Sequence, residues 1–144
     1  MITVILLSSL LVIVCVGIHY NSLVSLSSLR RRFGEKRKWW INLVILGALL
    51  THVVEMMLFS LCYSLLGPWD RYGSIIDSSG NPSEDYWYFS FVAYTSLGFG
   101  DLTPVGALRF MTALETLTGL VLIAWTASFL FVEMQSWAEE AQQE

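Results

Sequence analysis

A glycine-rich run near residue 100 has the composition of a cation-binding backbone loop. Residues 96–100 read Ser-Leu-Gly-Phe-Gly, and Asp101 follows them. A dehydrated cation needs closely spaced oxygen ligands, and inside a membrane only non-helical backbone that lines a cavity can offer its carbonyls. Gly98 and Gly100 permit backbone conformations that residues with a Cβ avoid, so successive carbonyls can point at one axis. The Ser96 hydroxyl can add a further ligand. The predicted ion-binding residues are Ser96, Leu97, Gly98, Phe99 and Gly100.

The composition of the chain is that of a membrane protein. Hydrophobic residues make up 55% of the sequence and charged residues 14%, against roughly 45–50% apolar residues in soluble domains. Three apolar runs, at residues 1–29, 39–66 and 105–137, are long enough to cross a bilayer as helices. Residues 85–96 would form a helix only about 18 Å long, so we expect this segment to enter the membrane and return. Its C-terminal end, with about half a negative charge, would then face the cation site.

Positive charge is concentrated between the first two apolar runs. Six of the eight Lys and Arg residues lie at positions 30–38. Because positive residues beside membrane spans stay in the cytoplasm, residues 30–38 are predicted to form a cytoplasmic loop. This places the N-terminus outside, the turn-rich residues 67–84 in an extracellular loop, and the tail at residues 138–144 in the cytoplasm.

The glycine-rich segment resembles the potassium-channel signature, which usually reads Thr-Val-Gly-Tyr-Gly-Asp. The resemblance covers residues 39–135 and is to small prokaryotic ion-channel subunits with one pore loop each. It implies an all-α membrane protein whose pore domain, residues 39–137, follows one extra transmembrane helix. The pore domain would comprise an outer helix (39–66), a re-entrant pore helix (85–96), a selectivity filter (96–101) and an inner helix (105–137).

The same resemblance implies a function and an assembly. Four pore loops complete one pore in that family, so one loop in each chain implies a homotetramer. The expected function is passive, selective conduction of K⁺, with K⁺ bound at the filter carbonyls as the permeant ion. The expected partners are K⁺ and membrane lipids, with no nucleic acid, no cofactor and no enzymatic activity. The minimal architecture indicates a prokaryotic inner membrane.

Several residues around the filter acquire roles from the resemblance. Family members bond the acid at the position of Asp101 to aromatic residues of the pore helix, for which Tyr88 or Trp87 could serve here. Thr95 is expected to support the filter. Gly119 falls where the inner helix of the family carries a hinge glycine. The alternative for Gly119 is close packing between helices, which small residues allow in membranes.

The inner helix should also line the conduction path. Apolar residues below the hinge recur at a spacing of three and four, which places them on one face of a helix. An apolar constriction on this face could close a pore by excluding water. The predicted cavity and gate residues are Leu120, Ile123, Ala127 and Phe131.

Three departures from the signature leave other functions open. Ser96 stands in place of the usual threonine, Leu97 in place of valine, and Phe99 in place of tyrosine, so the last position lacks a hydroxyl that could tether the filter. The carbonyls come from the backbone, so we expect selectivity to survive. The alternatives are a non-selective monovalent cation channel and, more distantly, a non-conducting accessory membrane protein.

Ionisable side chains are also expected deep in the membrane. They are His19, His52, Glu55 and Glu115, and their spacing fits no nucleophile or metal-binding motif. Glu55 and Glu115 lie about 16 Å and about 15 Å below the outer ends of their helices. We therefore predict that His52, Glu55 and Glu115 belong to a buried polar network behind the pore, rather than bonding only locally. The further hydroxyls that could satisfy the carboxylates are those of Thr112, Thr116 and Tyr94.

Overall fold

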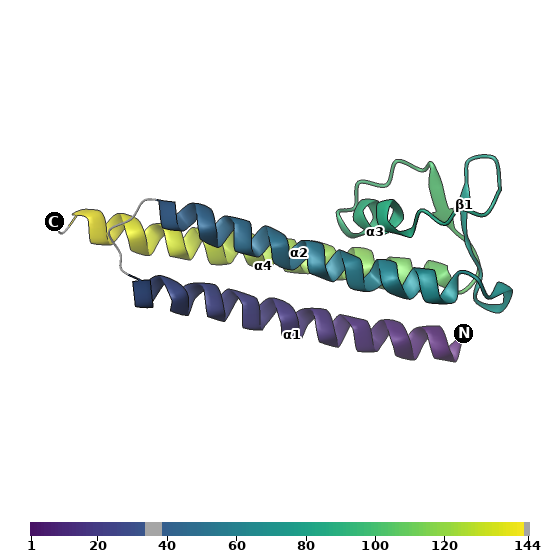
Figure 1. Cartoon of the computed structure of the whole chain (residues 1–144), viewed down its shortest axis with the longest axis horizontal. Helices are drawn as coiled ribbons and strands as arrows, with labels where there is room; N and C mark the ends of the chain where they lie inside the picture. The colour runs from purple at the N-terminus through teal and green to yellow at the C-terminus, as the bar shows by residue number, and fades with distance from the viewer. Residues whose placement is uncertain (34–38, 143–144) are drawn as a thin grey trace.

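Three long helices run side by side along the length of the chain. A computed structural model describes residues 1–33 and 39–142 and contains α1 (Ile2–Phe33), α2 (Trp39–Leu66) and α4 (Leu108–Gln142). Each includes a segment of 27 to 29 residues that is long and apolar enough to cross a membrane. The two termini lie at opposite ends of the molecule (Figure 1), as an odd number of crossings requires. The chain is therefore an integral membrane protein.

The shorter elements gather at one end of the helices. They are the 3-10 turn η1 (Asp70–Tyr72), the strands β1 (Ile75–Asp77) and β2 (Leu102–Pro104), and the helix α3 (Tyr86–Tyr94). The two strands pair antiparallel, with Ile76 opposite Thr103. This pairing joins the segment before α3 to the segment that leaves the glycine-rich run.

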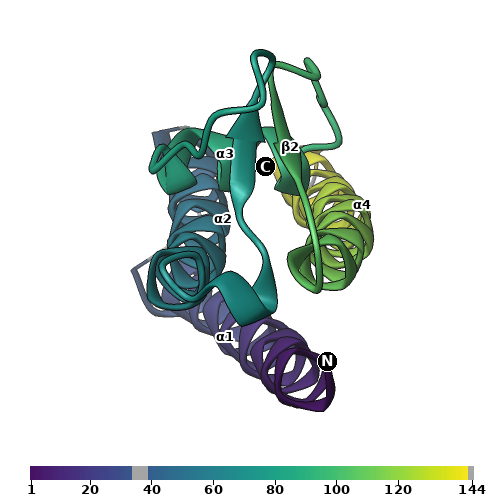
Figure 2. The ribbon, with the colours of Figure 1, turned by 90° about the vertical axis from the view of Figure 1, so that its right-hand side faces the viewer.

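Helices α2 and α4 pack against one side of α3. Viewed from the end that carries the strands, α3 and the strand pair lie over α2 and α4, and α1 lies on the opposite side (Figure 2). Accordingly, α3 packs on both α2 and α4, and α1 packs on the same two helices from behind. The hydrophobic core lies between these helices and beneath the loop, with Phe59, Tyr63, Ile75 and Met111 fully buried.

Some boundaries differ from those expected. The first helix continues to Phe33, beyond residue 29. The last helix starts at Leu108 instead of residue 105, because Gly106 turns the chain at φ 68°. It then runs to Gln142, so the expected tail continues the helix. Residues 34–38 of the basic loop and residues 143–144 lie outside the described part of the chain.

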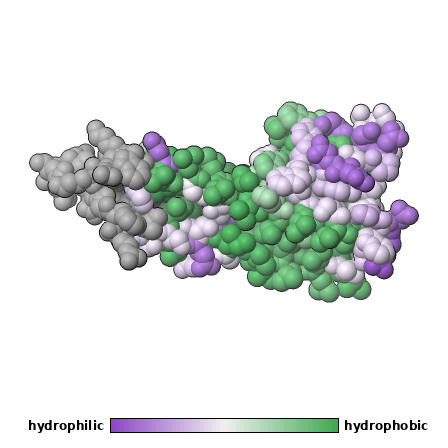
Figure 3. Space-filling view, viewed as in Figure 1, coloured by the Kyte–Doolittle hydropathy of each residue, from purple (hydrophilic) through white to green (hydrophobic). Residues whose placement is uncertain are grey.

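Much of the apolar surface is uncovered within a single chain. On α1, Ile2, Leu6, Leu10 and Ile13 are each more than half exposed. Apolar residues dominate the middle of the molecule, and polar residues gather at the end that carries the strands (Figure 3). Surface of this kind requires lipid or other subunits against it.

Candidate ion-conduction site

The backbone N–H groups at the start of the glycine-rich run point back to the end of α3. The N–H of Ser96 donates to the carbonyl of Ala93 at 3.0 Å, and those of Leu97 and Gly98 donate to the carbonyl of Val92 at 3.0 and 3.4 Å. These bonds satisfy carbonyls that a helix C-terminus otherwise leaves without a partner. In the described chain, no backbone N–H bonds to the carbonyl oxygens of residues 96–100.

The backbone φ angle of the run alternates between positive and negative values. Ser96, Gly98 and Gly100 have φ values of 59°, 51° and 79°, whereas φ is negative at Leu97 and Phe99. Ser96 is the only residue other than glycine with positive φ in the described chain. Alternation between left-handed and right-handed helical conformations is a backbone geometry that can direct successive carbonyls to one side of a chain. All five residues are exposed within the single chain.

The residues on either side of this run, Thr95 and Asp101, bond to α3. The Thr95 hydroxyl donates to the carbonyl of Phe91 at 2.7 Å, which fixes the residue before Ser96 to the helix. A hydrogen bond from Tyr88 to Asp101 raises the pKa of the Tyr88 hydroxyl. Trp87 stacks on Phe91 with ring centroids 6.1 Å apart. Asp101 is thus bonded to one of the two aromatic residues named from the sequence.

Gly119 is the point at which α4 touches the end of α3. A Cβ at this position would overlap the carbonyl oxygen of Tyr94 and lie 2.9 Å from its ring. Helix α4 continues through Gly119 without a break. The structure therefore provides a packing reason for the glycine, and a hinge at this position stays a prediction.

The predicted cavity residues share an uncovered face of α4. The exposed fractions are 52% for Leu120, 39% for Ile123 and 66% for Phe131, and Ala127 is exposed as well. In the described chain nothing covers this face, so it is available to line a pore or to contact another subunit.

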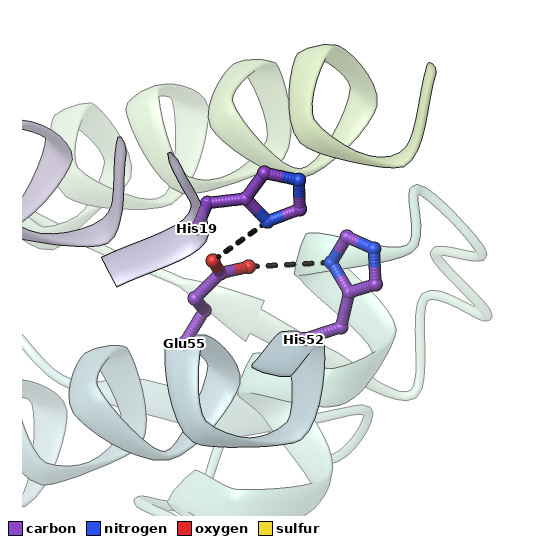
Figure 4. A group of neighbouring side chains, drawn as sticks. All are labelled: His19, His52 and Glu55. Carbon is purple, nitrogen blue, oxygen red and sulfur yellow. Dashed lines mark hydrogen bonds and ion pairs between the residues drawn. The ribbon is translucent and has the colours of Figure 1, made fainter. Parts of the chain in front are cut away.

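A buried cluster behind α3 centres on Glu55. Nδ1 of His19 lies 3.0 Å from Oε1 of Glu55, and Nδ1 of His52 lies 3.2 Å from Oε2 (Figure 4). His19 comes from α1, and the other two come from α2. The ligand atoms of these three side chains lie within 4.8 Å of one another, a spacing at which they could also converge on a metal ion.

Two hydroxyls close this cluster into a ring. The Tyr94 hydroxyl donates to Oε2 of Glu55 at 2.5 Å and lies 3.0 Å from Nδ1 of His52. The Thr126 hydroxyl, on α4, lies 2.9 Å from Nε2 of His52 and 3.2 Å from Nε2 of His19. All five side chains are buried. We call these five residues, which come from all three long helices and α3, the Glu55 ring.

Glu115 lies in a separate group of hydroxyls. Ser90 Oγ lies 2.5 Å from Oε1 of Glu115 and 2.7 Å from the carbonyl of Met56. The Tyr63 hydroxyl lies 2.6 Å from Oε2 of Glu115 and 3.0 Å from the Thr112 hydroxyl. Among the described residues, no hydrogen bond joins this group to the Glu55 ring.

The two carboxylates have only some of the expected partners, and they do not share one network: His52 and Tyr94 contact Glu55, whereas neither Thr112 nor Thr116 bonds a carboxylate directly. Tyr94 bonds Glu55, Thr112 reaches Glu115 only through Tyr63, and Thr116 donates to the carbonyl of Ala93 instead. The partners that the sequence did not assign to the carboxylates are His19, Tyr63, Ser90 and Thr126. Of these, only His19 had a signal, because it is the one histidine or acidic side chain in the first apolar run.

Comparison with known families identifies the chain. A family model described as Ion channel matches residues 43–136, about two thirds of the sequence, from α2 through α4. Neither the curated proteins nor the solved structures contain a significant match. Helix α1 lies outside the matched region although it supplies His19 to the Glu55 ring. The chain belongs to the ion-channel family that this model describes.

Proposed function

We propose that the chain is one subunit of a homotetrameric channel that conducts K⁺ passively and selectively. The observation that carries the proposal is the run at residues 96–100, whose carbonyls are free of backbone hydrogen bonds while its first N–H groups bond back to α3. The alternating φ signs support a row of carbonyls directed to one side of the chain. A row of inward carbonyls can replace the water shell of K⁺.

In this proposal the ion binds through the carbonyls of Ser96, Leu97, Gly98 and Phe99, and the Ser96 hydroxyl adds a ligand at the inner end. Helix α3 ends directly before this row, so its negative C-terminal end favours a cation there. The conformation also accounts for one departure from the family signature. Serine tolerates positive φ better than the usual threonine, because β-branched residues are disfavoured in that region.

The geometry of one chain supports assembly with further copies, and the number four comes from the family resemblance. A single run presents carbonyls to one side of an ion, and complete coordination needs further copies around an axis. The run and the face of α4 that carries Leu120 and Phe131 are both exposed within the single chain, so both surfaces are free to face such an axis. The inner cavity and gate would lie along this face of α4.

Purified protein in planar bilayers, with asymmetric K⁺ and Na⁺ solutions, tests the proposal. A reversal potential close to the K⁺ equilibrium value is expected. Equal permeation of Na⁺ would identify a non-selective cation channel instead. Absence of any current would favour an accessory membrane protein.

A pair of glycine variants tests the filter itself. Gly98→Ala places a Cβ on a residue at φ 51°, so we expect the preference for K⁺ over Na⁺ to be lost. Gly80→Ala is the control, because Gly80 also has positive φ, at 84°, and open space around its Cβ position, but lies in the turn after β1. An unchanged K⁺ preference in Gly98→Ala would contradict the assignment of the filter.

A further inference from the structure

The Glu55 ring has too few hydrogens when Glu55 is ionised and both histidines are neutral. A neutral imidazole has one N–H and one bare nitrogen, and a threonine hydroxyl has one hydrogen. Nδ1 of His19 must donate to ionised Glu55, so its Nε2 must accept the hydrogen of Thr126. Donation from Nδ1 of His52 instead would leave two bare Nε2 atoms for the one hydrogen of Thr126. For both Thr126 contacts to be hydrogen bonds, His52 must therefore donate from Nε2 to the oxygen of Thr126. Its Nδ1 is left as a bare nitrogen 3.2 Å from the carboxylate.

The Tyr94 hydroxyl cannot repair this contact. It has one hydrogen, and two acceptors compete for it, namely Oε2 of Glu55 at 2.5 Å and Nδ1 of His52 at 3.0 Å. The surrounding side chains leave little access for a water molecule that could donate instead, because His19, Glu55 and Tyr94 are fully buried. A buried acceptor that faces a carboxylate is unfavourable.

One additional proton completes the ring. Placed on Nδ1 of His52, it gives every contact one donor and one acceptor. The same balance results if the proton lies on His19 and the Thr126 hydroxyl turns to donate to His52, or if the proton lies on Glu55 itself. We propose that the Glu55 ring is a binding site for a single proton, shared by His19, His52 and Glu55, which couples α1 to the end of α3, ahead of the ion-binding run.

The electrostatic surroundings agree with a ring that is neutral as a whole. With one extra proton, ionised Glu55 is balanced by one positive imidazole, so no net charge is buried. Two further titratable groups act on the ring: the Cys15 thiol of α1 interacts with Glu55, and Glu115 of α4 interacts with Tyr94. The Trp125 ring of α4 packs on His19 at 5.4 Å and carries no charge.

The contacts favour a proton over a metal ion at this site. The two Nδ1 atoms approach different oxygens of one carboxylate at hydrogen-bond distances, and the two Nε2 atoms meet at the Thr126 hydroxyl. A zinc ion bound at about 2.0–2.1 Å would take a lone pair from each imidazole and break these contacts. A proton completes them without moving any side chain.

Only the expected effect of the proton on K⁺ preference rests on the proposed channel function. Tyr94 ends α3 directly before Thr95 and Ser96, and its carbonyl packs against Gly119. When rising pH removes the proton, bare Nδ1 of His52 faces both Glu55 and Tyr94, and the end of α3 is held less firmly. The preference for K⁺ should therefore be highest while the proton is bound and should fall as the pH rises.

The proton can be counted directly because the chain has two histidines. Nitrogen NMR of histidine-labelled protein in bilayers distinguishes protonated from bare ring nitrogens, and infrared spectroscopy detects a protonated Glu55. Near neutral pH we expect either three of the four ring nitrogens protonated, or two of the four together with an acid band that Glu55→Gln removes and Glu115→Gln leaves in place. Two neutral histidines beside an ionised Glu55 would overturn the proposal. Binding of one added Zn²⁺ per chain through both rings would overturn it in favour of a metal site.

A threonine pair provides matched variants. Thr126→Val removes the hydroxyl that joins the two Nε2 atoms, so His52 can donate from Nδ1 without the extra proton, and the count should fall by one. Thr118→Val is the control, because the Thr118 hydroxyl is also buried on α4 but bonds the carbonyl of Leu114 at 2.7 Å. An unchanged count in Thr126→Val would contradict the ring. The pH dependence of K⁺ flux should flatten in Thr126→Val alone. The proton count needs no current, so a protein that does not conduct would refute the channel function but would not contradict the proton site.

Discussion

Replacing Gly119 by alanine separates a packing role from a hinge role, because the two roles predict opposite changes in stability. A glycine that serves only as a flexible point weakens its helix, so alanine there should stabilise the fold by about 0.8–1.0 kcal/mol. The structure instead places the carbonyl oxygen of Tyr94 where the new Cβ would be. The obstacle is backbone at the end of α3, which cannot turn away as a flexible side chain could.

Overpacking of a close contact costs about 1–3 kcal/mol, which meets or exceeds the gain in helix propensity. We therefore expect Gly119→Ala to lower the free energy of unfolding by up to about 2 kcal/mol. For a chain of this size, that corresponds to a fall in Tm of roughly 2–4 °C per kcal/mol. Because the displaced group belongs to Tyr94, two residues before Ser96, the preference for K⁺ should weaken as well.

Gly17→Ala supplies the matched control for this measurement. Gly17 lies within α1, and a Cβ there would meet nothing within 4 Å in the chain. Its alanine variant should be as stable as the original protein or more so. Thermal unfolding in detergent or lipid, followed by circular dichroism, compares the three proteins. A Gly119→Ala protein that gains stability in parallel with Gly17→Ala would refute the packing argument and favour the hinge.

Two further predictions concern the ion-binding run and the loop before it. Ser96→Thr should lower the free energy of unfolding by about 1 kcal/mol, because φ of 59° disfavours a β-branched residue, whereas Ser96→Gly should not; thermal unfolding of both variants checks this. Asp77 has a pKa held below its ordinary value of 3.8, first by the backbone N–H of Asn81 and also by that of Ser79, so its ionised form stabilises the turn above that pH. This contribution is lost as the pH falls, so between about pH 5 and about pH 3 the original protein should lose more thermal stability than Asp77→Asn, and equal losses would contradict the role of the carboxylate.

The elements that carry the proposed site follow from simple sequence patterns. Length and hydropathy alone predict three spans, and the short aromatic segment before the glycines predicts α3, because nothing longer fits between the flanking turns. Gly98 and Gly100 mark positions at which the backbone can adopt positive φ. The positive φ of Ser96 could not be predicted in this way, because a residue with a Cβ disfavours it and it depends on the bonds from Leu97 and Gly98 back to α3.

Side-chain partners deep in the membrane are harder to predict. Counting residues gives the depth of Glu55 along α2, but it gives neither the rotation of α1 nor the reach of His19. By counting, His19 lies deeper than Glu55, so depth alone does not pair them. Their contact depends on the direction in which each side chain leaves its helix. Thr126 is harder still to identify from the sequence, because its hydroxyl acts only by bridging the imidazole rings of two other helices.

The two buried carboxylates look alike in the sequence, but their neighbours suit them to different tasks. The partners of Glu115 are hydroxyls, and Ser90 has one hydrogen for two acceptors, Glu115 and the carbonyl of Met56. A protonated Glu115 that donates to Ser90 satisfies both contacts, and no neighbouring base competes for that proton. Glu55 instead faces two imidazoles, each of which can hold the same proton with little movement. Loss of a proton leaves one negative charge buried at either site, but only at Glu55 do imidazoles face the carboxylate, and only that site holds the end of α3.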